Sequence, residues 1–315
     1  MNIMSIIMAI FGATAQGLTW AILALGVYIS FRILDFADLT CEGSFTLGGS
    51  ISAVLVVVLG WDPFLSLIIA ALAGMAAGGV TGLLHTKLKI PAILSGILTM
   101  IGVYSINLRI MGQANITILN KRTVISTIKG LFPKAAELGI RESTLQTWVT
   151  MLAGLMLTLA VIVLLYWLFG TEIGCCIRAT GNNAAMVRAQ GVNTDRVTIL
   201  GLIISNGLIA LSGALVTQSQ GYADINMGVG AIIIGLASII IGEVIFMKAR
   251  NFAMKLIAIM VGTVVYRIII AVVLQLGLDT DYMRLLTSIV VAAALSIPVL
   301  MKNKAVRQKG GKASC

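Results

Sequence analysis

The sequence has few charged side chains, one histidine and four cysteines. Charged residues make up 11% of the 315 residues, whereas soluble domains carry about a quarter. An ordinary soluble domain is therefore excluded. The single histidine, His85, argues against a zinc site built on a cluster of histidines. The cysteines form no Cys-x-x-Cys pair, and we interpret them as reduced thiols outside any disulfide framework: Cys41, Cys175, Cys176 and Cys315.

Two motif classes are also missing from the sequence. No Gly-x-x-x-x-Gly-Lys-Ser/Thr loop is present, so the chain itself cannot bind ATP in the P-loop manner. The apolar stretches hold no set of Ser, His and Asp and no group of metal ligands, which argues against an intramembrane hydrolase. We therefore predict no catalytic residue, no metal site and no cofactor in this chain.

Long apolar runs fill most of the sequence, in which 59% of the residues are hydrophobic. A run of 18 or more apolar residues is long enough to cross the ~30 Å hydrocarbon core of a bilayer. We predict an all-α fold, a polytopic transmembrane helical bundle that forms a single domain over residues 1–300. About nine spans are expected, at Ile3–Ile29, Phe45–Leu59, Phe64–Leu84, Pro91–Ile110, Trp148–Phe169, Val197–Val216, Gly228–Phe246, Phe252–Leu276 and Tyr282–Leu300.

The net charge of +10 indicates topology and not nucleic-acid binding. Cytoplasmic loops of membrane proteins hold the excess of Lys and Arg. Placing the C-terminus and the basic tail 301–315 in the cytoplasm puts the N-terminus outside for an odd number of spans, and residues 112–147 then form a long outer loop. The other cytoplasmic segments in this arrangement hold Arg32, Lys87, Lys89, Arg178, Arg188, Arg196, Lys248, Arg250 and Lys255.

A polar segment from Thr171 to Arg196 stands between two long apolar blocks. The run Gly181-Asn182-Asn183 can cap a helix start, because an Asn side-chain oxygen accepts a bond from a free N–H group. Gly191 fits the left-handed position after a helix end, which predicts a two-turn helix at 184–190. So short a helix is not stable alone, so we interpret the segment as a cytoplasmic docking site for a partner protein. An ordinary polar loop joining two spans is the alternative.

Charged and apolar residues alternate in the stretch FRILDFADLTCEGSF between the first two spans. Non-helical polar backbone at membrane depth is tolerated only where it is buried in protein or lines a watery cavity. We therefore predict a broken, partly re-entrant segment beside a solute pathway, with Asp35, Asp38, Thr40 and Glu42 in that pathway. Arg32 is the expected ion-pair partner of Asp35. The alternative is a short cytoplasmic hairpin whose charges lie in water.

Three further polar groups lie in predicted spans or just beyond the end of one. Asn107 and Gln218 are assigned to the solute pathway, although either could instead bond to a neighbouring helix. An ionisable group such as Arg267 inside a span is a functional candidate. Its alternatives are an outward-reaching side chain or an ion pair with Asp224 or Asp279.

Gly74, Gly78 and Gly82 repeat at every fourth position of the third predicted span. They line one helix face with the smallest residue, which permits close approach of another helix. That helix belongs either to the same subunit or to a second copy of the chain.

The sequence resembles the permease subunits of bacterial binding-protein-dependent ABC importers, in the branched-chain amino acid and ribose permease superfamily. The resemblance runs from about Gly17 to Leu300. It rests on GLTWAILALGVYISFRILDFADLTCEGSFTLGG, on SNGLIALSGALVTQSQGYADINMGVGAIIIGLASIIIGE, and above all on the polar segment 171–196. That segment is similar to the family's cytoplasmic segment through a G-x-N-x₇-G-x-N spacing, formed by Gly181, Asn183, Gly191 and Asn193.

Two departures from the ribose-type members stand out. Cys41 and Glu42 take the place of small or apolar residues, and an extra N-terminal span is missing. The overall pattern is most similar to a branch of singly encoded permeases linked to aromatic amino acid uptake.

The resemblance implies a homodimer of permease copies in the bacterial plasma membrane, two cytoplasmic ATPase subunits that bind the ATP, and an extracytoplasmic solute-binding protein. It implies import of a small polar solute such as an amino acid. The residues expected to couple the chain to the ATPase are Glu172, Gly181, Asn182, Asn183, Ala185, Arg188, Gly191 and Asn193. An ion-coupled secondary transporter that uses Asp35, Asp38 or Arg267 is the alternative function.

Overall fold

The computed structural model describes residues 3–119, 121–133, 141–247 and 251–275, together with residues 285, 288, 289 and 292. Helices dominate these residues, which confirms the predicted all-α class. The elements are α1 (Ile3–Val27), the π-helix η1 (Tyr28–Ile33), α2 (Thr40–Val57), α3 (Pro63–Thr86), α4 (Ala92–Met111), β1 (Asn115–Thr117), α5 (Val124–Lys129), α6 (Glu142–Gly170), α7 (Glu172–Ala189), α8 (Thr194–Gln220), β2 (Tyr222–Asp224), α9 (Ala231–Ile245) and α10 (Phe252–Gln275).

Seven helices among the described residues are long and apolar enough to cross a membrane: residues Ile7–Ile33, which join α1 to η1, and α2, α3, α4, α6, α8 and α10. Each of them overlaps one predicted span. The span predicted at Gly228–Phe246 contains α9, an apolar helix of 15 residues. The span predicted at 282–300 lies outside the described residues except for four single positions, so the count of nine stays a prediction.

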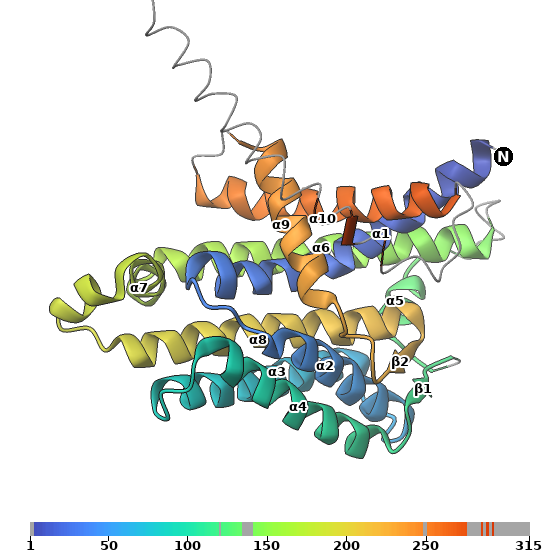
Figure 1. Ribbon diagram of the computed structural model, residues 1–315. Helices are drawn as coiled ribbons and strands as arrows, with labels where there is room; N and C mark the ends of the chain where they lie inside the picture. The colour runs from blue at the N-terminus through green and yellow to red at the C-terminus, as the bar shows by residue number, and fades with distance from the viewer. Residues whose placement is uncertain are drawn as a thin grey trace, which may run out of the picture.

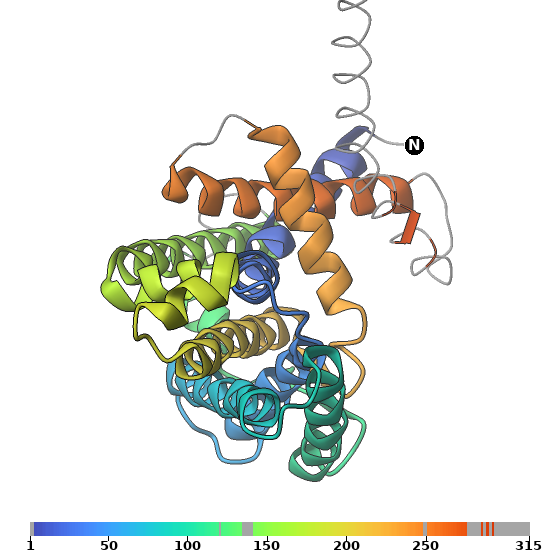
Figure 2. The ribbon, with the colours of Figure 1, turned by 60° about the vertical axis from the view of Figure 1, so that its left-hand side comes forward.

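The helices form two groups with α1 between them (Figure 1). On one side α2, α3 and α8 pack on one another, and α4 packs on α2 and α3. On the other side α1 contacts α6, α9 and α10, and α9 crosses α10 (Figure 2). Most of α2 is buried inside the protein. A broken connection at residues 34–39 leads from η1 into α2 and therefore ends in the interior of the bundle.

The three spaced glycines of α3 pack against α8 of the same chain. A β-carbon at Gly74 or Gly78 would meet the backbone of Asn206 or Leu202, and one at Gly82 would touch Ile199. The structure therefore uses this glycine face for close packing inside the subunit. An exposed glycine face that a second copy could cover is not observed in α3.

The molecule has two different ends (Figure 1). The β end carries β1 and β2, which pair antiparallel with Ile116 opposite Ala223, together with α5 and the start of α1. The α7 end carries α7 and the connection between α3 and α4. In the predicted topology the β end faces outwards and the α7 end faces the cytoplasm. The predicted outer loop 112–147 contains β1 and α5, while residues 134–140 lie outside the described part.

Candidate functional site

Helix α7 is a kinked helix, which we call the elbow (residues 172–189). Its first arm begins after Thr171, whose Oγ1 accepts a hydrogen bond from Gly174 N at 3.4 Å. The kink lies at Asn183, where φ is −157° and ψ is 91°. Asn183 Oδ1 accepts a hydrogen bond from Met186 N at 3.0 Å, which caps the second arm.

The ends of the second arm confirm the cap prediction. Gly191 has a φ of +86°, in the left-handed region, and Asn193 Oδ1 then caps α8 by accepting from Arg196 N at 3.1 Å. The predicted two-turn helix was too short, because it covers only the second arm. The structure has a further helical arm before the kink. Local propensity missed this arm because tertiary packing stabilises it, around the fully buried side chain of Ile177.

The first arm rests directly on the end of the first span. Gly181 lies so close to Ile33 and Leu34 that a β-carbon would collide with the Ile33 carbonyl group. The Leu34 side chain in turn lies against the position of Gly201 in α8. Gly181 was predicted as part of a helix cap. In the structure it instead allows the first arm to pack closely against Ile33 and Leu34. Movement of the elbow would therefore push on the residues immediately after η1.

The second arm is largely exposed. Residues 182–186 are exposed, and of the arm only Val187 is buried. This exposed group includes three residues predicted to couple, Asn182, Asn183 and Ala185; Glu172 at the start of the first arm is exposed as well. Arg188 Nη2 donates a hydrogen bond to Thr194 Oγ1 at 2.7 Å, which holds the arm against α8. The arm is thus available for a partner at the α7 end (Figure 1).

The first span ends in η1, and a non-helical connection at 34–39 leads to α2, as the sequence predicted. Asp38 in this connection is fully buried and accepts hydrogen bonds from Asn206 Nδ2 at 2.6 Å and Thr40 N at 2.9 Å. Asn206 Oδ1 accepts from Ser44 Oγ at 2.7 Å. A hairpin with all its charges in water is therefore wrong for Asp38. Asp35, by contrast, is exposed, so the two carboxylates do not face one space.

The expected ion pair between Arg32 and Asp35 is not formed. Arg32 makes two hydrogen bonds of 2.9 Å to the carboxylate of Glu243 in α9. The expectation assumed a continuous helix, whereas Asp35 lies beyond η1 with a φ of +53°. Glu42 Oε1 accepts a hydrogen bond from Gly230 N at 2.9 Å. Carboxylates therefore hold α9 at both of its ends.

The remaining predicted pathway residues make contacts between helices. Thr40 Oγ1 and Thr81 Oγ1 are 2.7 Å apart in a hydrogen bond between α2 and α3. Asn107 is buried in α4 and donates to Gly43 O at 3.5 Å, and its Oδ1 has no partner among the described residues.

Gln218 forms the most complete of these contacts. Its Oε1 accepts from Val124 N at 2.8 Å, and its Nε2 contacts Ser52 Oγ, Ser66 Oγ and Pro63 O at 2.9, 2.9 and 3.2 Å. These contacts join α8 to α2, α3 and α5. A role of Gln218 in the solute pathway stays a prediction.

Arg267 in α10 does not pair with Asp224, whose carboxylate faces Asn115 and the backbone N of Asn226. Its guanidinium lies over the Trp20 ring, 4.1 Å from the ring centroid. The Nε and Nη2 atoms are buried and have no hydrogen-bond partner among the described residues, so the side chain does not reach fully outwards. Asp279, the other expected partner, lies outside the described residues.

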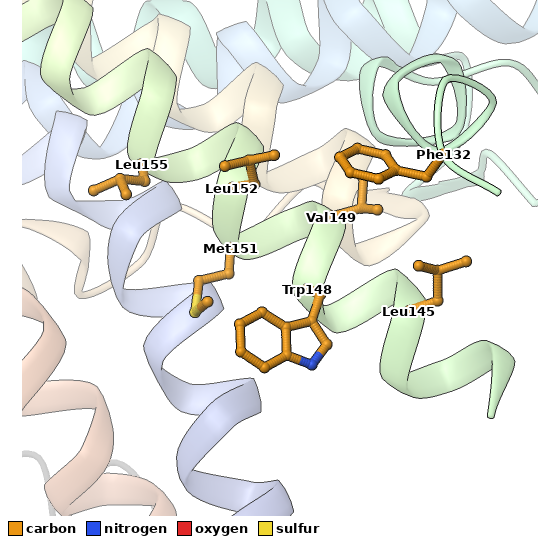
Figure 3. A pocket seen from close by; sticks show the side chains of 7 residues that line it. All are labelled: Phe132, Leu145, Trp148, Val149, Met151, Leu152 and Leu155. Carbon is orange, nitrogen blue, oxygen red and sulfur yellow. The ribbon is translucent and has the colours of Figure 1, made fainter. Parts of the chain in front are cut away.

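One hollow lies on α6 near the β end (Figure 3). Its volume is about 410 Å³, and its lining is apolar, with Phe132 above residues of α6 that include Trp148 and Leu152. Such a wall offers no hydrogen-bond partner to a polar solute. The hollow lies on a helix long enough to span the membrane and is not a candidate solute site.

Comparison with known proteins decides the family. Residues 9–295 match the family described as the permease component of branched-chain amino acid transport systems. The chain belongs to this family. It is 40% identical over 291 residues to a tyrosine transport system permease protein of Clostridioides difficile, covering 91% of this chain and 90% of the relative.

More distant relatives belong to other importers. A ribose import permease protein of Haemophilus influenzae is 26% identical over 203 residues, which covers 64% of this chain and 56% of that protein. An autoinducer 2 import system permease protein of Salmonella choleraesuis is 28% identical, with 55% of this chain and 47% of the relative covered. No solved structure matches the chain. The permease is thus a multi-pass bacterial inner-membrane protein and the permease component of an ABC importer, a transport subunit whose family implies ATPase and binding-protein partners.

Proposed function

We propose that this permease imports tyrosine or another aromatic amino acid. The main support is the 40% identity, over about nine tenths of both chains, to a tyrosine transport system permease protein. The ribose-type relative is similar over a smaller part of the chain and at 26% identity. A solute-binding protein outside the cell delivers the solute, and two copies of the permease enclose its pathway.

We further propose that the elbow couples the permease to a cytoplasmic ATPase. The observation that supports this role is the close approach of Gly181 to Ile33 and Leu34, at the entrance to the connection that holds Asp38. ATP binding favours one arrangement of two ATPase subunits, and its differential affinity for the two states supplies the free energy of the change. The exposed second arm follows the ATPase, and the first arm passes the motion to η1 and α2 as a rigid-body rotation.

The test is uptake of radiolabelled tyrosine into proteoliposomes that contain the permease, its ATPase and its binding protein. We expect uptake that requires ATP and that excess phenylalanine or tryptophan reduces more strongly than leucine or ribose does. Uptake that continues without ATP and follows an ion gradient would instead identify a secondary transporter. Equal competition by all four solutes would contradict the aromatic assignment and leave the ATP dependence standing.

A further inference from the structure

A hollow of about 280 Å³, whose lining includes charged side chains, lies at the α7 end between the elbow and the connection from α3 to α4. Both segments lie at the same end of the molecule (Figure 1). The lining of the hollow contains no residue of the connection 34–39, although His85 in the lining packs against Phe36 of that connection. Its lining includes His85, Lys89, Thr180, Ala184, Arg188 and Asp195.

The charged residues in this lining leave an excess of positive charge. Lys89 Nζ lies 3.7 Å and Arg188 Nη2 lies 3.8 Å from the two carboxylate oxygens of Asp195. One carboxylate thus faces two cations. Both cationic side chains are more than two-thirds exposed, at 75% and 68%, so an additional anion can reach them, while the hydrogen bonds from Arg188 to Thr194 Oγ1 hold that guanidinium in place.

The wall also holds a hydroxyl group that is not satisfied. Thr180 is 7% exposed, and its Oγ1 is buried without a hydrogen-bond partner among the described residues. A threonine in a helix usually donates to a carbonyl group one turn back, as Thr198 in the same wall does to Thr194 O at 3.0 Å. A buried hydroxyl without a partner is unfavourable. Because Thr180 is one of the residues that line the hollow, an acceptor atom that reached Oγ1 from the hollow would satisfy it.

We propose that this hollow receives an acidic side chain of the ATPase subunit. Its carboxylate pairs with Lys89 and Arg188 and accepts a hydrogen bond from Thr180 Oγ1. The occupant follows from the position of the wall, because Thr180 and Arg188 belong to opposite arms of the elbow. A protein that grips the elbow therefore also covers the mouth of the hollow. This inference rests on the proposed coupling function.

Zero-length cross-linking tests the contact in the purified complex of the full permease with its ATPase. A carbodiimide joins a lysine amine to a carboxylate only when the two groups are in contact. We expect mass spectrometry to find Lys89 joined to an Asp or Glu of the ATPase. The Lys89→Gln variant should lose this product, and Lys87→Gln, in the same connection but outside the hollow's lining, should keep it. An intrachain link from Lys89 to Asp195 without any link to the ATPase would overturn the proposal.

Binding measurements provide a second test that does not depend on the lysine. Thr180→Val removes the hydroxyl at nearly constant volume and should weaken ATPase binding about tenfold, the effect expected for a hydrogen bond to a charged group. Thr198→Val is the matched control. The Thr198 hydroxyl already donates its proton to Thr194 O, and a carboxylate carries no proton to donate to the Thr198 oxygen. Equal affinities for the two variants would contradict the proposal.

The two tests also separate this inference from the proposed function. A wild-type permease that binds no ATPase would contradict the coupling role itself. The inference alone would be contradicted if the wild-type permease binds the ATPase and imports solute but gives no cross-link, and Thr180→Val binds the ATPase as tightly as the wild type does.

Discussion

The two ends of the permease are built differently. At the β end, a strand pair joins the residues after α4 to those after α8, and Gln218 makes hydrogen bonds to several neighbouring segments. At the α7 end, the ion pairs of Arg32, Lys89 and Arg188 are exposed, and the second arm of the elbow has one buried side chain. Exposed ion pairs contribute about 0–1 kcal/mol each. With the coupling role proposed above, the comparison predicts that the β end is the fixed part of the subunit and the α7 end the part that moves.

The largest expected effect is at the fixed end. Gln218→Leu leaves the buried Val124 N–H group without its acceptor and removes the amide donor that Ser52 and Ser66 share, although these two hydroxyl groups still bond to each other. We expect the free energy of unfolding to fall by about 3 kcal/mol, because an unsatisfied buried N–H group costs about 1–3 kcal/mol and each further lost hydrogen bond about 1 kcal/mol. Denaturation in detergent measures this loss, with the exposed Gln146→Leu in α6 as control. In the protein that remains folded, the ratio of ATP hydrolysed to solute imported should stay unchanged. A changed ratio would show that residues at the β end also contribute to coupling.

The next effect concerns the buried connection. Asp38→Ala removes the acceptor for Asn206 Nδ2 and Thr40 N. We expect a loss of about 2 kcal/mol in stability, since both donors are buried, and a strong loss of uptake in complexes that still assemble. Asp35→Ala, at the exposed carboxylate of the same connection, should change both quantities little. If Asp38→Ala only lowers the yield, and the assembled complexes import normally, the connection is structural.

A smaller change in stability is expected at the contact of the elbow. Gly181→Ala forces a β-carbon towards the Ile33 carbonyl group, and overpacking of this kind costs about 1–3 kcal/mol. We expect ATP hydrolysis to continue while uptake falls about tenfold or more, because the elbow no longer lies against η1. Gly79→Ala is the matched control, as its β-carbon would make only ordinary contacts with Ile203. Similar uptake by both variants would show that the close approach at Gly181 does not transmit motion.

The smallest effect is expected for the exposed pair between Arg32 and Glu243, at 61% and 38% side-chain exposure. Arg32→Gln should lower the free energy of unfolding by less than about 1 kcal/mol, and added salt should remove most of the difference. Thermal denaturation at low and high ionic strength measures it. The exchanged pair Arg32→Glu with Glu243→Arg should restore the wild-type value, and a loss that salt does not change would show that the pair is not screened by solvent.

Features that depend on neighbouring residues were predictable. Apolar runs marked the helices long enough to span a membrane, and the single residues Asn183 and Gly191 marked the start and end of the second arm. The break before α2 followed from charges placed among apolar residues. Each of these signals lies within a few residues of the structure that it predicts.

Features that join distant residues were not predictable. The strand pair, the ion pair of Arg32 with Glu243 and the bond of Asp38 to Asn206 all link positions more than a hundred residues apart. The hydrophobic pattern of one segment predicts its secondary structure, but it does not predict which other segment packs beside it.

The amino-acid sequence by itself thus determined that this protein crosses a membrane, which segments form its long apolar helices, and that a polar segment interrupts them. Only the tertiary structure decided that Gly181 lies against the first span, that the glycine face of α3 packs inside the subunit, and that Asp38 is buried while Asp35 is not. The physical reason is that helix formation depends on local backbone and side-chain preferences. Burial and pairing depend instead on which helices the folded chain brings together.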